Sequence, residues 1–288
     1  MSRRTLAAVA LAMATLLLAV PARADHVPGS PEHPEWAPLS SATIRPGVRV
    51  STQSGGCTTN FIFYERHEDA EGNVTFDVYI GLAAHCFTLG GSTGTNGCIT
   101  PTRPHGSPAT VTGATHPAEL VYSSWVTMQA VEESDSNTCA TNDFAVVRLD
   151  PRDHGKVNPT LQFYGGPDGL RTTATAAATE VFSYGNSSLR MGISQLSPKR
   201  GYATGTSNGG WSHRVYTVTP GIPGDSGSAF VDDGGHALGV LVTLQLAPMP
   251  ASNGVTDLNR ALTYLRDKSG RNVQVAVATQ AFQDRILP

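Results

Sequence analysis

The chain has 288 residues, of which 40% are hydrophobic and 15% are charged, with 30 glycines and 19 prolines. This composition excludes a wholly disordered chain, a collagen and a coiled coil, and it suits one large domain or two small ones. The formal net charge is −3 at pH 7, so the sequence indicates no basic surface for nucleic acid. The low charge and the many Ser, Thr, Gly and Val residues favour β structure with frequent turns.

The first 24 residues have the pattern of a secretory signal peptide. Two basic residues, Arg3 and Arg4, precede an apolar run from Leu6 to Val20, and Ala22-Arg23-Ala24 matches the small-x-small pattern of a cleavage site. The apolar run is shorter than the roughly 20 apolar residues of a membrane span, so it favours a signal peptide over a membrane anchor. We expect no membrane anchor once the signal peptide is removed. No later stretch approaches that length, and we expect no transmembrane segment.

Residues 25–43 are rich in proline and polar side chains, which predicts an extended linker or a short pro-region before a domain that begins near Ile44. From Val48 onward, β-prone runs alternate with clusters of turn-forming residues. This rhythm predicts antiparallel strands in a sandwich or a barrel. The runs are 60–64, 74–82, 108–111, 120–130, 144–149, 161–164, 179–184, 215–219, 228–231 and 237–246.

The last part of the chain contains one helical pattern. Four apolar residues occur at helical spacing, with Asp257 before them as an N-cap and Gly270 after them. The four are Leu258, Ala261, Leu262 and Leu265. The pattern predicts one short amphipathic helix. Residues 271–288 form a tail whose sequence predicts no helix or strand.

The chain contains four cysteines, an even number: Cys57, Cys86, Cys98 and Cys139. In an exported chain, such a set favours disulfides. There is no CxxC pair and no HExxH motif, so the sequence does not favour structural zinc. Four cysteines allow three pairings.

Three local motifs combine residue types used in nucleophilic catalysis. They are Gly81–Cys86 (GLAAHC), Thr141–Leu149 (TNDFAVVRL) and Pro223–Phe230 (PGDSGSAF). A serine hydroxyl is a weak nucleophile that needs a neighbouring base, which histidine supplies near neutral pH, and a carboxylate orients that histidine. Each motif alone is weak, because Gly, Asp and Ser also form ordinary turns.

Together these motifs resemble the trypsin-like (chymotrypsin-fold) serine protease family, particularly its secreted bacterial branch. The resemblance extends from about Ile44 to Gly270, and the family's strand beside the substrate cleft is similar to Gly239–Leu244. It implies an all-β fold of two packed antiparallel Greek-key β-barrels with a short C-terminal helix. We expect barrel 1 at about 44–155, barrel 2 at about 156–270 and the tail at 271–288, within a protease domain that spans 44–288.

The resemblance implies a role for each central residue. Ser226 is expected to be the nucleophile, His85 the general base and acid, and Asp143 the carboxylate that orients His85. The backbone N–H groups of Gly224 and Ser226 would form an oxyanion hole. Asp225 would support that turn by pairing with a cation. Because Ile44-Arg45-Pro46-Gly47 is a poor match to the family's activated N-terminus, we expect this cation to be an internal arginine.

The substrate pocket departs from the basic-specific members of the family. The resemblance assigns Pro220, Thr243, Leu244 and Gly254 to the pocket, and those members carry an acid where this chain has Pro220. We therefore expect a small or apolar residue, not Lys or Arg, before the cleaved bond. Thr243 has a second interpretation, in which its hydroxyl supports Asp143.

The resemblance also implies the disulfide Cys57–Cys86, which leaves Cys98–Cys139 as the second pair. No cofactor and no metal are expected. The expected activity is that of a secreted, extracellular and monomeric serine endopeptidase, which takes protein or peptide substrates and binds no nucleic acid.

Two other functions are compatible with this sequence. The first is a non-catalytic binding or regulatory module on a protease scaffold, because a fold does not determine a function. The second is an esterase, although the α/β-hydrolase order of Ser, acid and His differs from the order found here. The other eight histidines are interpreted as structural, since six of them lie in turn-like or linker contexts and His116 and His213 show no ligand spacing.

Overall fold

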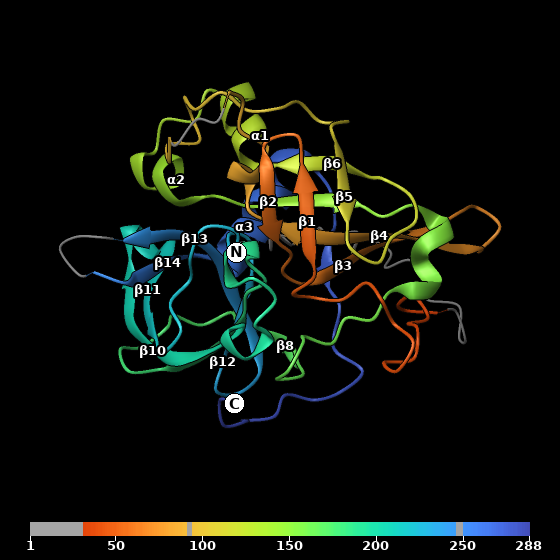
Figure 1. The fold of residues 1–288 in the computed structure, drawn as a ribbon. Coiled ribbons are helices and arrows are strands. Elements are labelled where there is room, and N and C mark those ends of the chain that lie inside the picture. Colours follow the sequence, from red (N-terminus) through yellow and green to blue (C-terminus); the bar gives the residue numbers. More distant parts are fainter. Residues whose placement is uncertain (1–30, 91–93, 246–249) are drawn as a thin grey trace, which may run out of the picture. The chain divides into compact units, whose positions relative to one another are not determined.

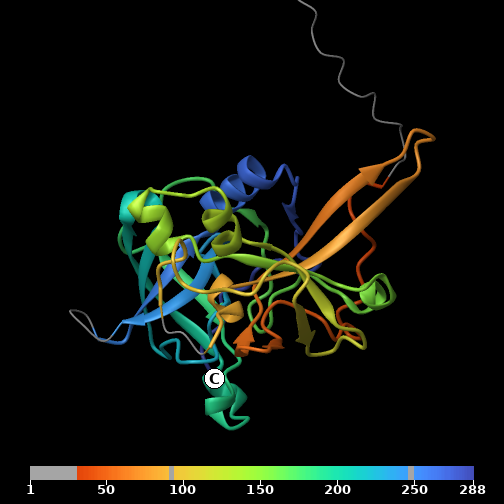
Figure 2. The same ribbon diagram turned by 90° about the horizontal axis from the view of Figure 1, so that it is seen from above.

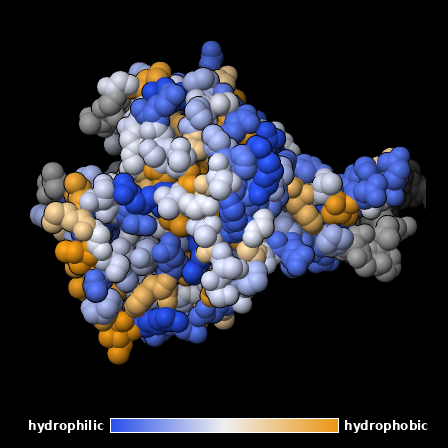
Figure 3. All heavy atoms as spheres, turned by 45° about the vertical axis from the view of Figure 1, so that its right-hand side comes forward, coloured by the Kyte–Doolittle hydropathy of each residue, from blue (hydrophilic) through white to orange (hydrophobic). Residues whose placement is uncertain are grey.

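Two largely antiparallel sheets contain the strands of the computed structural model, which describes residues 31–90, 94–245 and 250–288 (Figure 1). The predicted signal peptide and the start of the predicted linker lie outside these residues. Within them, no helix is both long and apolar enough to cross a membrane. Figure 3 shows hydrophobic side chains interspersed with hydrophilic ones on one face of the surface.

The first sheet has eight strands in the order β15-β3-β4-β7-β6-β5-β1-β2. Its first and last strands are not paired with each other among the described residues, so the sheet is a half-barrel. The β3–β4 hairpin projects beyond the rest of this sheet (Figure 2). The strands are β1 (Arg49–Thr52), β2 (Gly55–Thr58), β3 (Ile62–Glu68), β4 (Val74–Leu82), β5 (Pro108–Val111), β6 (Ala118–Ser123), β7 (Ala145–Arg148) and β15 (Gln274–Val275).

The second sheet has seven strands in the order β12-β9-β10-β11-β14-β13-β8, and a further β12–β13 pairing closes six of them into a barrel. The expected all-β architecture is therefore confirmed, with one closed and one half-closed barrel. The strands are β8 (Gly169–Leu170), β9 (Glu180–Tyr184), β10 (Pro198–Ser207), β11 (Ser212–Thr217), β12 (Ala229–Asp232), β13 (His236–Gln245) and β14 (Ser252–Asp257). The α-helices are α1 (Ser124–Ala130), α2 (Ser136–Thr141) and α3 (Leu258–Ser269), and the 3-10 helices are η1 (Ala84–Phe87), η2 (Pro151–Lys156), η3 (Ser188–Arg190), η4 (Ser194–Leu196) and η5 (Asn208–Gly210).

The hydrophobic core joins the two sheets. Its larger cluster contains residues of both, such as Ile80 of β4 and Phe182 of β9, together with the apolar face of α3. A smaller cluster fills the interior of the closed barrel, where alternate residues of its strands point inward. Because one cluster contains residues of both sheets, packing between them holds their facing loops in place.

The predicted C-terminal helix is confirmed as α3. The Asp257 carboxylate accepts a hydrogen bond from the Arg260 N–H at 2.8 Å, as an N-cap does, and Gly270 ends the helix with a φ of +70°. The predicted strands 74–82 and 108–111 match β4 and β5.

Two predicted strands are wrong. The run 120–130 is a strand only as far as Ser123, after which α1 begins. The Ser124 hydroxyl donates to the Asn142 carbonyl at 2.8 Å and accepts from the Phe144 N–H at 3.1 Å. These contacts with residues distant in sequence hold the chain where β6 ends and α1 begins. The run 161–164 is a turn, in which Phe163 has a φ of +69°.

The tail after α3 binds both sheets, although its sequence predicts no structure. It first pairs with β3 through Gln274–Val275. Further on, the Gln283 N–H donates to the Tyr164 carbonyl at 2.7 Å, and the Phe282 ring lies 4.9 Å from the ring of Phe182 in β9. The tail, dark blue in Figure 1, therefore ties the half-barrel to the closed barrel.

Candidate functional site

His85 lies in η1, directly after β4. The disulfide Cys57–Cys86 joins the end of β2 to the residue that follows His85, which confirms this predicted pairing. Ala83 and Ala84 before it are completely buried, whereas the His85 side chain keeps 25% of its surface exposed. The local fold therefore holds the backbone rigidly and leaves the imidazole accessible from one side.

Asp143 binds His85 at two points. Its Oδ2 atom lies 2.6 Å from His85 Nδ1, and its Oδ1 atom accepts a hydrogen bond from the His85 backbone N–H at 2.9 Å. Asp143 lies in the short segment between α2 and β7, and its side chain is 10% exposed. With Nδ1 directed at the carboxylate, the ring presents Nε2 as its second nitrogen.

Burial and charge act in opposite directions on His85. Desolvation disfavours the imidazolium and lowers the pKa of His85, whereas the charge and the hydrogen bond of Asp143 raise it. The net pKa of His85 lies above its ordinary value of 6.5. The carboxylate thus makes the imidazole a better proton acceptor.

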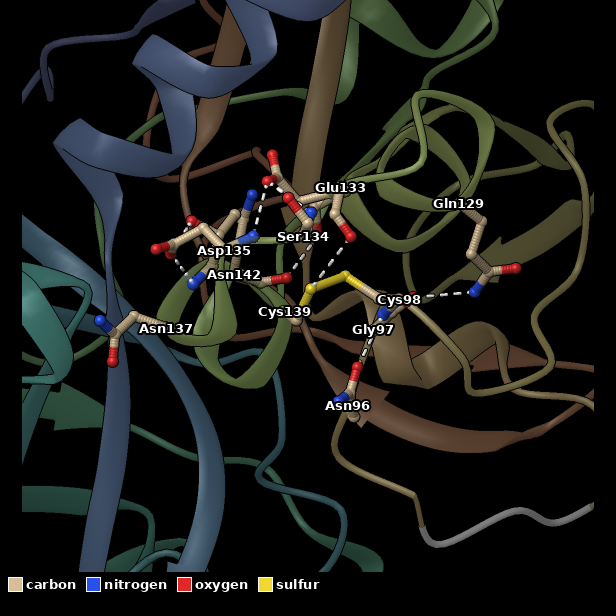
Figure 4. Close-up of a disulfide and its surroundings, with 12 residues drawn as sticks. Asn96, Gly97, Cys98, Gln129, Glu133, Ser134, Asp135, Asn137, Cys139 and Asn142 are labelled. Atoms are coloured by element: carbon tan, nitrogen blue, oxygen red, sulfur yellow. Dashed lines mark hydrogen bonds between the residues drawn. A yellow bond between two sulfur atoms is a disulfide. The ribbon is translucent and has the colours of Figure 1, made fainter.

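The second disulfide, Cys98–Cys139, is confirmed (Figure 4). Cys139 belongs to α2, four residues before Asp143, and its carbonyl accepts a hydrogen bond from the Gly97 N–H at 2.8 Å. The Gln129 side chain of α1 in turn donates to the Gly97 carbonyl at 2.8 Å. These bonds connect the loop around Cys98 to both α1 and α2.

Trp125 in α1 is a site residue that the sequence prediction missed. Its side chain is almost completely buried, and its ring lies 6.4 Å from the His85 ring. The residue stands in a run that looked like a strand, so no sequence signal placed it near His85.

The turn around Ser226 packs against the segment that carries His85. A Cβ atom on Gly227, whose φ is +90°, would lie 2.4 Å from the Thr58 carbonyl oxygen and 3.0 Å from the Ala83 nitrogen. Only glycine allows so close an approach. The Thr58 N–H also donates to the Ser226 carbonyl at 2.8 Å, so the turn around Ser226 contacts both β2 and the backbone before His85.

The backbone of this turn offers two free donors. Among the residues that the structure describes, the N–H groups of Gly224 and Ser226 have no hydrogen-bond acceptor, whereas the Asp225 N–H donates to the Ile222 carbonyl at 2.9 Å. The Thr58 hydroxyl holds the Gly224 carbonyl at 2.8 Å. Two unpaired N–H groups in a fixed turn suit the binding of an oxyanion.

Asp225 is completely buried and forms ion pairs with two cations. One is Arg190 of η3, which confirms the predicted pairing with an internal arginine. The other is Lys199 of β10, whose Nζ lies 2.9 Å from Asp225 Oδ2. Sequence reasoning missed Lys199, because a lysine in a strand is usually exposed.

A cavity of about 240 Å³ contains His85 and Asp143 in its wall. The remaining lining residues are Gly94, Thr95, Val242, Thr243 and Leu244. Two of the four predicted pocket residues, Thr243 and Leu244, therefore lie beside the His–Asp pair.

The other two predicted pocket residues do not line this cavity. The carbonyl of Pro220 is instead contacted by Arg190 and Lys199. Gly254 lies in β14 opposite Thr243, where a Cβ atom would approach Thr243 Oγ1 to 2.4 Å. No hydrogen bond joins Thr243 to Asp143 within the described part of the chain, so the structure gives no support to that second interpretation of Thr243.

Among the described residues, two groups have donor atoms close enough to hold a metal ion. The first consists of His85 with Cys57 and Cys86, whose sulfur atoms already form a disulfide. The second consists of Glu65, His67 and Asp77 on the β3–β4 hairpin. Glu65 is already bound by the Tyr79 hydroxyl at 3.0 Å, by Arg271 and by the Asn272 N–H, so its oxygens are occupied by protein donors.

Comparisons with known proteins give structural likenesses only. No family model matches the chain, and no curated protein matches its sequence. Thermobifida fusca protease A aligns at 15% identity with a TM-score of 0.49, over 82% of this chain and 100% of that one. A glutamic acid specific serine protease aligns at 17% identity with a TM-score of 0.46, over 81% of this chain and 100% of that one. A Nocardiopsis protease aligns at 18% identity with a TM-score of 0.44, over 81% of this chain and 99% of that one.

The coupling between His85 and Asp143 predicts a shift in histidine titration. In the Asp143→Asn variant the charge is lost while the shape is kept, so burial should dominate and the pKa of His85 should fall below that in the unmodified protein. NMR titration of the histidine ring signals measures this shift. His154, whose pKa burial lowers at a distant position, is the internal control and should not change. An unchanged His85 titration would contradict the pairing.

Proposed function

We propose that the chain is a serine endopeptidase in which Ser226, His85 and Asp143 act together. The observation that carries the proposal is the two-point contact of Asp143 with His85 in the wall of a cavity, with the Ser226 turn packed against the segment before His85. This arrangement supplies a nucleophile, a base and an orienting acid at the junction of two sheets.

The chemistry follows from these roles. His85 Nε2 takes the Ser226 hydroxyl proton as the oxygen attacks the carbonyl carbon of a peptide bond. The imidazolium then gives the proton to the leaving amine, which departs and leaves an acyl-enzyme. A water molecule, deprotonated by the same nitrogen, hydrolyses the ester and restores Ser226. Asp143 keeps the Nδ1 proton in place and stabilises the imidazolium throughout.

The negative oxygen of the tetrahedral intermediate needs donors in fixed positions. The unpaired N–H groups of Gly224 and Ser226 are our proposed oxyanion hole. Removal of one such donor typically costs about 3 kcal/mol of transition-state stabilisation. Because the buried Asp225 accepts a hydrogen bond from the Ser187 N–H at 3.0 Å, it would keep this turn in shape.

The surroundings of the cavity support a non-basic preference at the residue before the cleaved bond. Pro220 stands where basic-specific relatives have an acid, and its carbonyl faces two cations, Arg190 and Lys199. A lysine or arginine of the substrate would find no acid at residue 220. Leu244 lines the cavity, and its bulk would shorten the space for a substrate side chain. A small or apolar side chain fits this environment best.

The site of action that we propose is extracellular. The leader pattern in residues 1–24 is typical of export, and two disulfides are typical of an oxidising compartment. We place the protease domain at residues 44–288 and propose that it acts as a monomer on proteins or peptides. Part of the preceding segment also packs on it, since the Ala37 N–H donates to the Val157 carbonyl at 2.9 Å.

Replacement of the nucleophile tests the proposal. The Ser226→Ala variant should keep the melting temperature of the parent and lose at least about 10⁴-fold in kcat, because the attacking oxygen is gone. Hydrolysis of a denatured protein measures this loss, and the exposed Ser134→Ala variant is the matched control. Full activity in Ser226→Ala would refute the assignment. A parent protein that hydrolyses no peptide would instead favour a non-catalytic module.

The cleavage preference can be read from the products of one digestion. Mass spectrometry of peptides from a fully denatured protein should show small or apolar residues before most cleaved bonds, because the acid in the cavity wall, Asp143, is already bound to His85. The Ser226→Ala digest is the background control. A strong preference for Arg or Lys at that position would contradict this part of the proposal.

A further inference from the structure

The turn that carries Ser226 is attached to a buried cluster of three charges. Asp225 and Lys199 have no exposed side-chain surface, and Arg190 keeps only 7%. Both cations approach the same carboxylate oxygen, Asp225 Oδ2. One cation would suffice to neutralise the carboxylate, so the second one calls for a separate explanation.

Lys199 connects two segments of the site. Its ammonium group lies 2.9 Å from Asp225 Oδ2, 3.4 Å from the Thr219 carbonyl and 3.4 Å from the Pro220 carbonyl. An ammonium group has three N–H donors, and these three acceptors use all of them. Lys199 thereby ties the Ser226 turn to the Thr219 and Pro220 carbonyls, and Arg190 is also bonded to the Pro220 carbonyl.

No acid other than Asp225 compensates the charge of Lys199 among the residues that the structure describes. β9 places Ser183 opposite it, the segment before the turn presents the two carbonyls, and the charged groups that face it are Asp225 and Arg190. Burial disfavours the ammonium form, Asp225 favours it and Arg190 opposes it. The net effect lowers the pKa of Lys199 from 10.5 to about 8.

We propose that Lys199 is a positioning residue for the oxyanion hole, and that loss of its proton sets the alkaline limit of activity. In the charged form it holds Asp225 and the Thr219–Pro220 carbonyls together, so that the N–H groups of Gly224 and Ser226 point to the same place. In the neutral form these contacts weaken, and Asp225 keeps Arg190 as its paired cation together with the Ser187 and Ile222 N–H groups. This inference rests on the proposed endopeptidase function.

The same titration acts on stability in the opposite direction. The unfolded chain keeps the lysine proton up to its ordinary pKa of 10.5, whereas the folded chain releases it at about 8. Between these values the unfolded state binds more protons, so the contribution of this group to the free energy of unfolding rises with pH. A loss of activity from Lys199 is thus distinguishable from unfolding, to which this group does not contribute in that range.

The test compares pH profiles of kcat and melting temperature for the parent, Lys199→Met and Lys156→Met. The control, Lys156, lies 2.7 Å from the buried carboxylate of Asp153, outside the proposed site. The parent and the control should lose activity as pH rises through about 8, while both remain folded. Lys199→Met should have about tenfold lower kcat near neutral pH, about 1.4 kcal/mol, and no loss across this range.

Three outcomes decide the matter. A parent without peptidase activity refutes the proposed function itself. An active parent whose alkaline limit persists unchanged in Lys199→Met refutes only the role of Lys199. If Lys199→Met does not fold, Lys199→Arg decides, because arginine keeps its charge: an alkaline limit moved upward supports the role, and an unmoved one overturns it.

Discussion

The two-point contact between Asp143 and His85 is the interaction on which the rest of the site depends. One carboxylate oxygen binds the imidazole and the other binds the backbone of the same residue, which determines both the position and the orientation of the ring. The fold supports each partner covalently. Cys86 follows His85 directly, and Cys139 precedes Asp143 by four residues, and each belongs to a disulfide.

A second buried carboxylate, Asp225, holds the turn that faces this pair. An isolated buried charge is costly, so both carboxylates persist only because donors surround them. For Asp143 the donors belong to the histidine that it orients. For Asp225 they are Arg190, Lys199 and backbone N–H groups of the surrounding loops. The two clusters thus fix the two halves of the proposed chemistry, proton transfer and oxyanion binding, independently of each other.

Local sequence motifs predicted the proposed catalytic residues better than the residues that hold them in place. His85, Asp143 and Ser226 each occur in a short motif, and α3 has helical spacing and both caps, so these features are readable over a few residues. Lys199 and the tail are different, because their partners lie 26 residues and more than 80 residues away along the chain. Such contacts form only when the sheets pack together. The sequence around Lys199 and the sequence of the tail therefore contain no local pattern that predicts them.

The central claim is that Ser226, His85 and two backbone N–H groups surround one reacting atom. A crystal structure of the protein after reaction with a fluorophosphonate tests it most directly. The account predicts phosphorus bonded to Ser226 Oγ with fluoride displaced, and the phosphonyl oxygen within hydrogen-bond distance of the N–H groups of Gly224 and Ser226. A label on another residue, or a phosphonyl oxygen directed away from both N–H groups, would contradict it.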